Sequence, residues 1–172
     1  MSQRFYIETL GCPKNDVDSD KLVGALLADG MESTDDAALA DLVVVNTCAF
    51  IDDARRESID TILALDEARA DGSRLVVTGC MAERYGSELA EALPEVDQVA
   101  GFGVPVQPRA DDRKLIPVTA APLPELDLLN LPRPASSSPW AYIKIAEGCD
   151  RSCGFCAIPS FRGPQRSRDI AQ

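Results

Sequence analysis

Short apolar runs alternate with amphipathic stretches over the first hundred residues. The run Leu42–Val45 is continuous and mostly β-branched, which is typical of a strand buried on both faces of a parallel sheet. The whole pattern predicts strands at Phe5–Leu10, Met31–Thr34, Leu42–Val45, Leu75–Thr78 and Val96–Ala100. Helical periodicity between them predicts helices at Asp16–Asp29, from Asp52 or Asp53 to Ala70, and at Met81–Leu93. This alternation predicts an α/β fold with a flavodoxin- or Rossmann-like parallel sheet and right-handed crossovers.

The amino-acid composition of the chain changes after residue 101. Eight of the 12 prolines lie in residues 102–139, which we interpret as an extended linker between domains. An apolar alternation restarts at residues 141–145 and predicts the first strand of a second domain, over residues 140–172, that is not completed. Residues 1–140 hold 12 of the 17 basic and 25 of the 28 acidic residues, net −13, whereas residues 141–172 are net +2.

The composition excludes several classes of protein. Histidine is absent, so His-ligated zinc, Ser-His-Asp triads and Cys-His proteases are all ruled out. A net charge of −11 over 172 residues does not suit a protein that coats nucleic acid. No apolar stretch approaches the ~20 residues of a membrane helix, and the start does not resemble a signal peptide. We therefore expect a cytoplasmic protein without membrane contact, whose six cysteines stay reduced rather than forming three disulfides.

Three of the cysteines form one short loop. Cys149, Cys153 and Cys156 have the spacing Cys-x3-Cys-x2-Cys. Three thiolates within eight residues can wrap one face of a cubane iron–sulfur cluster, binding three irons and leaving the fourth open. Structural zinc normally takes four closed ligands, and no fourth cysteine lies nearby. The loop therefore predicts a cluster with an open iron to which a small molecule binds.

The other three cysteines are distributed, but each follows a predicted strand: Cys12, Cys48 and Cys80. The carboxyl ends of parallel strands meet at one edge of a sheet, where ligands bind. In the flavodoxin-like order 2-1-3-4-5 these strands are neighbours about 4.8 Å apart, which brings the three thiols within roughly 10 Å of one another. A lone cysteine is usually a buried structural residue. Three at equivalent positions, each before the positive end of a helix, predict a shared metal centre, again with one iron open.

Together the two sets resemble the methylthiotransferase family of radical S-adenosylmethionine enzymes. The loop matches the radical S-adenosylmethionine signature, and the resemblance extends to Leu10–Asn15, Val45–Ile51, Thr78–Cys80, Ile145–Cys149 and Phe155–Gly163. Within the family, Gly-Cys-Pro-Lys-Asn at residues 11–15 is similar to the RimO type, which modifies an aspartate of small-subunit ribosomal protein S-twelve. The branch that modifies transfer RNA usually has Gly-Cys-Gln-Met-Asn there.

This resemblance implies two 4Fe-4S clusters and S-adenosylmethionine as cofactors. It assigns the radical cluster to the three loop cysteines, the auxiliary cluster to the three distributed ones, and Phe155 to the neighbourhood of the adenine. The implied reaction converts C–H into C–SCH3 on the aspartate and needs an electron donor. No catalytic side chain is assigned, because the chemistry belongs to the cofactors.

Several alternatives remain open on the sequence alone. The same chemistry could act on an adenosine of transfer RNA, or the chain could be a non-catalytic iron–sulfur or zinc module. The acidic N-terminal part would attract a basic ribosomal protein by charge. For the same reason we expect this part not to bind nucleic acid directly. The family's barrel continues past this point and a further domain follows, so we expect residues 1–172 alone not to turn over. Arg162, Arg166 and Arg168 could contact carboxylates or phosphates, but exposed arginines usually do neither.

Overall fold

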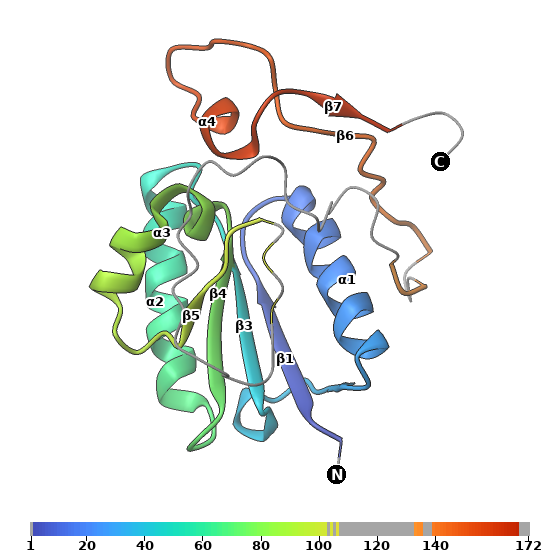
Figure 1. The fold of residues 1–172 in the computed structure, drawn as a ribbon, viewed down its shortest axis with the longest axis vertical. Coiled ribbons are helices and arrows are strands. Elements are labelled where there is room, and N and C mark those ends of the chain that lie inside the picture. The colour runs from blue at the N-terminus through green and yellow to red at the C-terminus, as the bar shows by residue number, and fades with distance from the viewer. Residues whose placement is uncertain (1, 103, 105, 107–132, 136–138, 169–172) are drawn as a thin grey trace.

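A five-stranded parallel sheet forms the centre of the computed structural model (Figure 1), which describes residues 2–102, 104, 106, 133–135 and 139–168. The strand order is β2-β1-β3-β4-β5, the flavodoxin-like order. Its strands are β1 (Arg4–Thr9), β2 (Glu32–Ser33), β3 (Leu42–Thr47), β4 (Arg74–Gly79) and β5 (Gln98–Val99). The helices that connect them are α1 (Pro13–Ala28), the short 3-10 helix η1 (Ala37–Leu39), α2 (Asp52–Ala68) and α3 (Cys80–Ala92).

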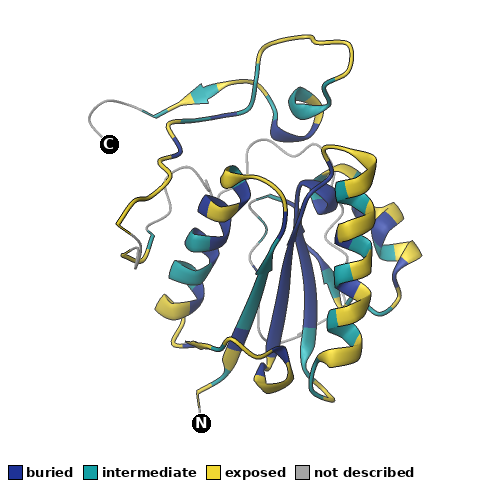
Figure 2. Ribbon diagram, turned by 180° about the vertical axis from the view of Figure 1, so that it is seen from behind, coloured by how far each residue is buried: buried dark blue, intermediate teal, exposed yellow. Residues whose placement is uncertain are grey.

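The central strand β3 is covered by packed side chains on both faces of the sheet. All six of its residues are buried, and it pairs with β1 on one side and β4 on the other. Val43 and Val45 pack in the core cluster that contains Ile62 of α2 and Met81 of α3. The alternate residues of β3 join the second cluster, with Leu22 and Leu26 of α1. Figure 2 shows the buried strands between helices whose outer surfaces are exposed.

The predicted α/β class is confirmed, and so are the parallel pairing and the strand order. One boundary shift affects the cysteines: α1 begins at Pro13, three residues before the predicted start. Proline suits this first helical position because its missing N–H has no partner there. Cys12 thereby becomes the N-cap of α1, with no hydrogen bond from its side chain to the helix.

The strand predicted at residues 141–145 is wrong. The chain there is irregular, and Ile143 and Ile145 are 75% and 71% exposed. Strand β6 (Ala146–Glu147) begins at the next residue and pairs antiparallel with β7 (Arg166–Ser167), after the short helix α4 (Ile158–Arg162). A strand needs a neighbouring strand for its backbone hydrogen bonds, and residues 141–145 have none in the described part of the chain. The carbonyl of Ile145 accepts from Arg168 N–H (2.9 Å), and that of Tyr142 accepts from the side chain of Arg133 (2.5 Å).

The second part of the chain lies over the edge of the sheet at which the strands of the first part end. Figure 1 shows β6, α4 and β7 above the carboxyl ends of β1, β3 and β4, and α4 contacts α3. Most of the predicted linker, residues 102–139, lies outside the described residues. In the part that is described, the strand pair after residue 140 is antiparallel, so no parallel barrel pair is present there. The described helices include none of the length and apolarity needed to cross a membrane.

Candidate metal centre at the carboxyl edge of the sheet

The three distributed cysteines lie at one edge of the sheet, where β1, β3 and β4 end. Cys12 caps α1, Cys48 directly follows β3, and Cys80 is the first residue of α3. The register pairs Thr9 with Asn46 and Thr47 with Gly79, so the three strands end side by side. Cys12 is exposed, whereas Cys48 and Cys80 are each 7% exposed. The three cysteines therefore lie at the edge where ligands of open parallel sheets bind.

The backbone at Gly11 and the surroundings of Cys80 describe how these three residues are packed. A Cβ placed on Gly11, which has φ +98°, would lie 2.7 Å from Cys48 Cβ and 2.8 Å from its Sγ, so the loop before Cys12 passes directly over Cys48. Burial raises the pKa of the Cys80 thiol, and the guanidinium of Arg162 offsets part of that rise. The thiols of Cys48 and Cys12 add to the rise of the same pKa.

Buried polar side chains hold the loops that carry these cysteines. Asn15 is fully buried, and its amide nitrogen donates to the carbonyls of Leu10 (2.8 Å) and Thr47 (3.0 Å). The hydroxyl of Ser58, on α2, accepts from Cys48 N–H at 3.1 Å, and its single proton is shared between the carbonyls of Ala54 (2.8 Å) and Cys48 (3.1 Å). These bonds tie the end of β1 to the end of β3 and fix the backbone at Cys48. Buried polar groups whose hydrogen bonds are made in this way hold the loops in a single conformation.

The donor chemistry of this edge fits an iron–sulfur cluster. Three cysteines lie at this edge near the first residues of helices, and Arg162 bonds to the sulfur of one of them, Cys80; a helix N-terminus and a guanidinium both favour a thiolate and an anionic centre. The side chains, however, are not gathered into a ligand group: among the described residues no three Cys, Asp or Glu side chains converge on a point suited to a metal ion. The sulfur of Cys80 instead accepts a hydrogen bond from Arg162 Nη2 at 3.1 Å.

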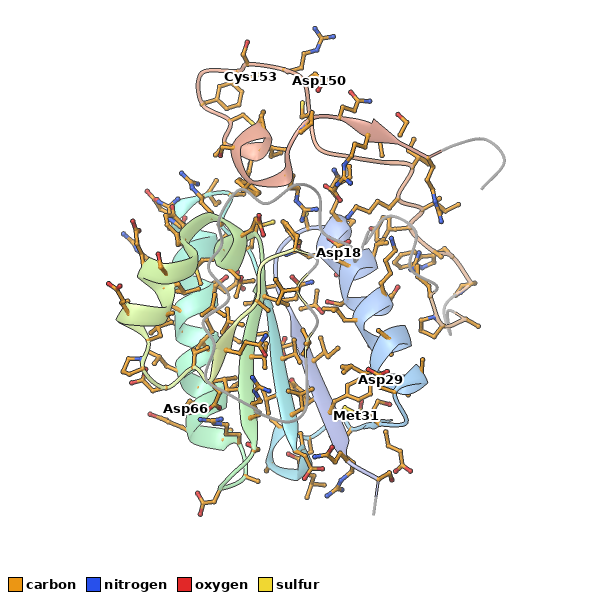
Figure 3. The ribbon with its side chains drawn as sticks, in the orientation of Figure 1. Asp18, Asp29, Met31, Asp66, Asp150 and Cys153 are labelled. Atoms are coloured by element: carbon orange, nitrogen blue, oxygen red, sulfur yellow. The ribbon has the colours of Figure 1, made fainter. Side chains whose placement is uncertain are left out.

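The loop cysteines line a hollow of their own on the outer side of the second part. Cys149, Cys153 and Cys156 share its wall with Asp150, Arg151, Ser152, Pro159, Ser160 and Pro164, around a volume of about 510 Å³. Figure 3 shows Cys153 and Asp150 at the outer end of this loop, away from the sheet. The base of the loop is closed by Cys149 N–H donating to Gly163 C=O (3.1 Å). Gly148 has φ +76° and lies so close to Pro164 that a Cβ would meet its carbonyl oxygen at 2.1 Å, so glycine is required there.

Phe155 and Arg162 lie in opposite surroundings, the first exposed and the second buried. Phe155 is 90% exposed and is not part of the wall of this hollow, so its ring is neither a core residue nor in contact with the loop cysteines' cavity. Arg162 is 7% exposed and bonds to carboxylates, which is the less favoured of the two possibilities that the sequence left for it. The missed signal is its position directly after buried Phe161, because these two residues close the one-turn helix α4 against the sheet edge.

Comparisons with known proteins identify the family of this chain. The sequence profile described as "Uncharacterized protein family UPF0004" matches residues 4–101. A protein of Frankia casuarinae is 43% identical over 98% of this chain and 40% of its own length. Relatives from Desulfosudis oleivorans (44% identical, 98% and 40%) and Myxococcus xanthus (45% identical, 96% and 36%) are similar to the same extent. All three are named "Ribosomal protein uS12 methylthiotransferase RimO".

The chain thus spans about two fifths of the length of the curated relatives that it matches. The profile covers more than half of its residues, including the whole parallel sheet and the three distributed cysteines. The chain therefore belongs to the UPF0004 family, whose domain forms the N-terminal part of the methylthiotransferases, and over nearly all of its length it is similar to the RimO type.

Proposed function

We propose that the chain is part of a radical S-adenosylmethionine methylthiotransferase that converts C–H into C–SCH3 on an aspartate of a small-subunit ribosomal protein. The observation that carries this proposal is the placement of Cys12, Cys48 and Cys80 at equivalent positions on one sheet edge, with a second three-cysteine loop held above it. The names of the relatives supply the substrate, ribosomal protein uS12.

The proposal assigns each cysteine set to one 4Fe-4S cluster. Cys149, Cys153 and Cys156 hold the radical cluster, and the three cysteines at the sheet edge hold the auxiliary one. With both clusters and S-adenosylmethionine bound, the chemistry supplied is a 5′-deoxyadenosyl radical, a sulfur atom and a methyl group. Three ligands on each side leave one iron position for a small molecule. Because the sulfur of Cys80 now touches Arg162, its side chain and those of its neighbours must turn toward a common point as the cluster is assembled.

The protein's own residues position and shield the cofactors. Ser58 and Asn15 fix the loops of the auxiliary site by the buried hydrogen bonds described above. Arg162 places a positive charge beside Cys80 and favours its thiolate. The exposed ring of Phe155 is free to take the position near the adenine that we propose for it. The nucleophilic and redox steps stay with the cofactors, so no side chain is proposed as an acid or base.

Charge supports the choice of a protein substrate. Residues 1–140 are net −13, which attracts a basic ribosomal protein and repels transfer RNA. We propose accordingly that this part of the chain does not bind nucleic acid directly. The proposal also requires an electron donor and a cytoplasmic setting in which thiols stay reduced. The division of the chain at residues 101 and 139 remains a prediction, as does the absence of turnover by residues 1–172 alone.

Anaerobic reconstitution with iron and sulfide tests the cluster assignment. The whole protein that contains this segment is expected to bind about eight irons, two four-iron clusters. Serine at all three of residues 12, 48 and 80 should leave about four irons, and serine at residues 149, 153 and 156 should leave the other four, so each triple variant is the control of the other. Colourless protein that binds zinc instead would contradict the proposal and support the metal-binding module.

Substrate choice is tested by offering the reconstituted protein ribosomal protein uS12 and transfer RNA in parallel, with a reductant and S-adenosylmethionine. Mass spectrometry should find the methylthio group on an aspartate of uS12 and none on the RNA. Methylthio-adenosine as the product would overturn the ribosomal assignment while leaving the chemistry intact.

A further inference from the structure

Four charged side chains are buried together between α1 and the second part of the chain: Asp18, Lys144, Glu147 and Arg162. Their side chains are 3%, 3%, 10% and 4% exposed, in that order. Arg162 Nη1 donates to Glu147 Oε1 at 2.9 Å and to Asp18 Oδ2 at 3.3 Å. Lys144 Nζ contacts Asp18 Oδ1 at 2.5 Å and also pairs with Glu147. Two cations and two carboxylates therefore balance one another, and Figure 3 shows Asp18 at the end of α1 that faces this segment.

The other nitrogen of the same guanidinium reaches the cysteine edge. Arg162 Nη2 donates to Asn15 Oδ1 at 3.0 Å and to Cys80 Sγ at 3.1 Å. The guanidinium carbon lies 4.7 Å from the centre of the Phe102 ring, over which the group is placed. One planar group thus joins two carboxylates, an amide and a thiol. Lysine cannot make this set of contacts, because its ammonium has no fork of fixed donors.

Arg162 is also rigidly connected to the loop that carries the other three cysteines. It ends α4, which begins two residues after Cys156, and the next residue, Gly163, accepts the hydrogen bond from Cys149 N–H. A buried charge is costly unless it is paired. Arg162 therefore keeps its ion pairs and hydrogen bonds only when the second part of the chain lies where it does in this structure. The same side chain therefore sets where the loop lies and which donor faces Cys80.

We propose that Arg162 is a positioning residue that holds the three-cysteine loop over the sheet edge and donates a hydrogen bond to the sulfur of Cys80. The first half concerns the protein without iron. The second half rests on the proposed function: when Cys80 ligates the auxiliary cluster, the donor withdraws electron density from the sulfur and makes the cluster easier to reduce.

Two measurements on the whole protein test this role, each with Arg162→Gln and with Arg56→Gln as the matched control. Arg56 lies on α2 with its side chain 78% exposed and pairs only loosely with Asp53, at 3.8 Å. The first measurement is amide hydrogen exchange on the iron-free protein. We expect residues 144–167 to exchange at least tenfold faster in Arg162→Gln and unchanged in Arg56→Gln.

The second measurement is the reduction potential and electron paramagnetic resonance spectrum of the auxiliary cluster, in a background with C149A, C153A and C156A so that no other cluster contributes. Arg162→Gln should lower the potential by about 59 mV, which is a tenfold change in the equilibrium constant of a one-electron couple. Arg162→Lys keeps the charge without the fork, and a smaller shift in the same direction provides the test if the glutamine variant does not fold.

Each outcome tests a different part of the proposal. Unchanged exchange in Arg162→Gln overturns the holding role, whatever the metal content. An unchanged potential and spectrum, with the cluster present, overturn the hydrogen bond to Cys80. A parent protein that takes up no iron at residues 12, 48 and 80 overturns the proposed function, and the exchange measurement then still decides whether Arg162 holds the loop.

Discussion

Replacing Gly11 with alanine tests how closely the loop before Cys12 passes over Cys48. Gly11 has φ +98°, a conformation that costs an L residue about 1–2 kcal/mol. The added methyl group would also lie 2.7 Å from Cys48 Cβ. The Sγ of Cys48 can rotate away, but its Cβ is fixed to the backbone, which Ser58 holds from both sides. Overpacking of this kind costs about 1–3 kcal/mol, so the expected loss of unfolding free energy is about 2–5 kcal/mol.

Urea denaturation of the iron-free protein measures this loss, and Gly72→Ala is the matched control. Gly72 has φ +80° with nothing within 4 Å of an added Cβ, so only the conformational cost of about 1–2 kcal/mol applies there. Gly11→Ala is also expected to reduce iron uptake at the three-cysteine edge, because Cys48 must shift, whereas Gly72→Ala is not. Equal losses of stability in the two variants would refute the close approach of Gly11 to Cys48.

Three further predictions concern the sheet and its edge. Ser58→Ala removes the hydroxyl that accepts from the N–H of buried Cys48 and shares its proton between the carbonyls of Ala54 and Cys48, and should cost about 1–3 kcal/mol in urea denaturation; a loss near zero would contradict these hydrogen bonds. Ile62→Ala, at 0% exposure, should cost about 2–5 kcal/mol and Ile62→Val about 0.5–1.5 kcal/mol, and equal losses would contradict a tightly packed core. The hydrogen bond with Glu8, helped by burial, raises the pKa of Tyr6 to about 12. Because the folded-state pKa lies above the usual 10, its stabilising effect is present below pH 10 and is lost as the pH rises toward 12. Absorbance titration at alkaline pH should show this late tyrosine, and Glu8→Gln should move it toward 10.

Most of the α/β fold and the placement of the cysteines could be predicted from local pattern. The β-branched run of β3 predicted a strand buried on both faces, because no other element buries consecutive residues so completely. Proline and glycine marked the helix ends, as at Gly30 after α1. Once parallel strands were expected, the position of a cysteine just after each of three strands placed all three at one edge, since that follows from topology alone.

The site itself could be predicted only as a set of residue types. Spacing identified the six thiols, but it did not show that Cys80 bonds to a guanidinium in the iron-free protein. Nor could local pattern place Phe155, whose exposure depends on what lies beside its loop. The apolar alternation at residues 141–145 predicted a strand, yet a strand exists only where a second chain segment accepts its hydrogen bonds.

What the sequence alone determined, then, are the elements of the parallel sheet, their order and the positions of the thiols just after three strands, because each depends on periodicity or residue type within a few neighbours. Tertiary structure decided the surroundings of Arg162. Its partners Asp18 and Cys80 lie 144 and 82 residues away along the chain, and a buried guanidinium forms only where folding brings such carboxylates and acceptors to one point. No local pattern carries that information, because a free arginine and a buried one look alike in sequence.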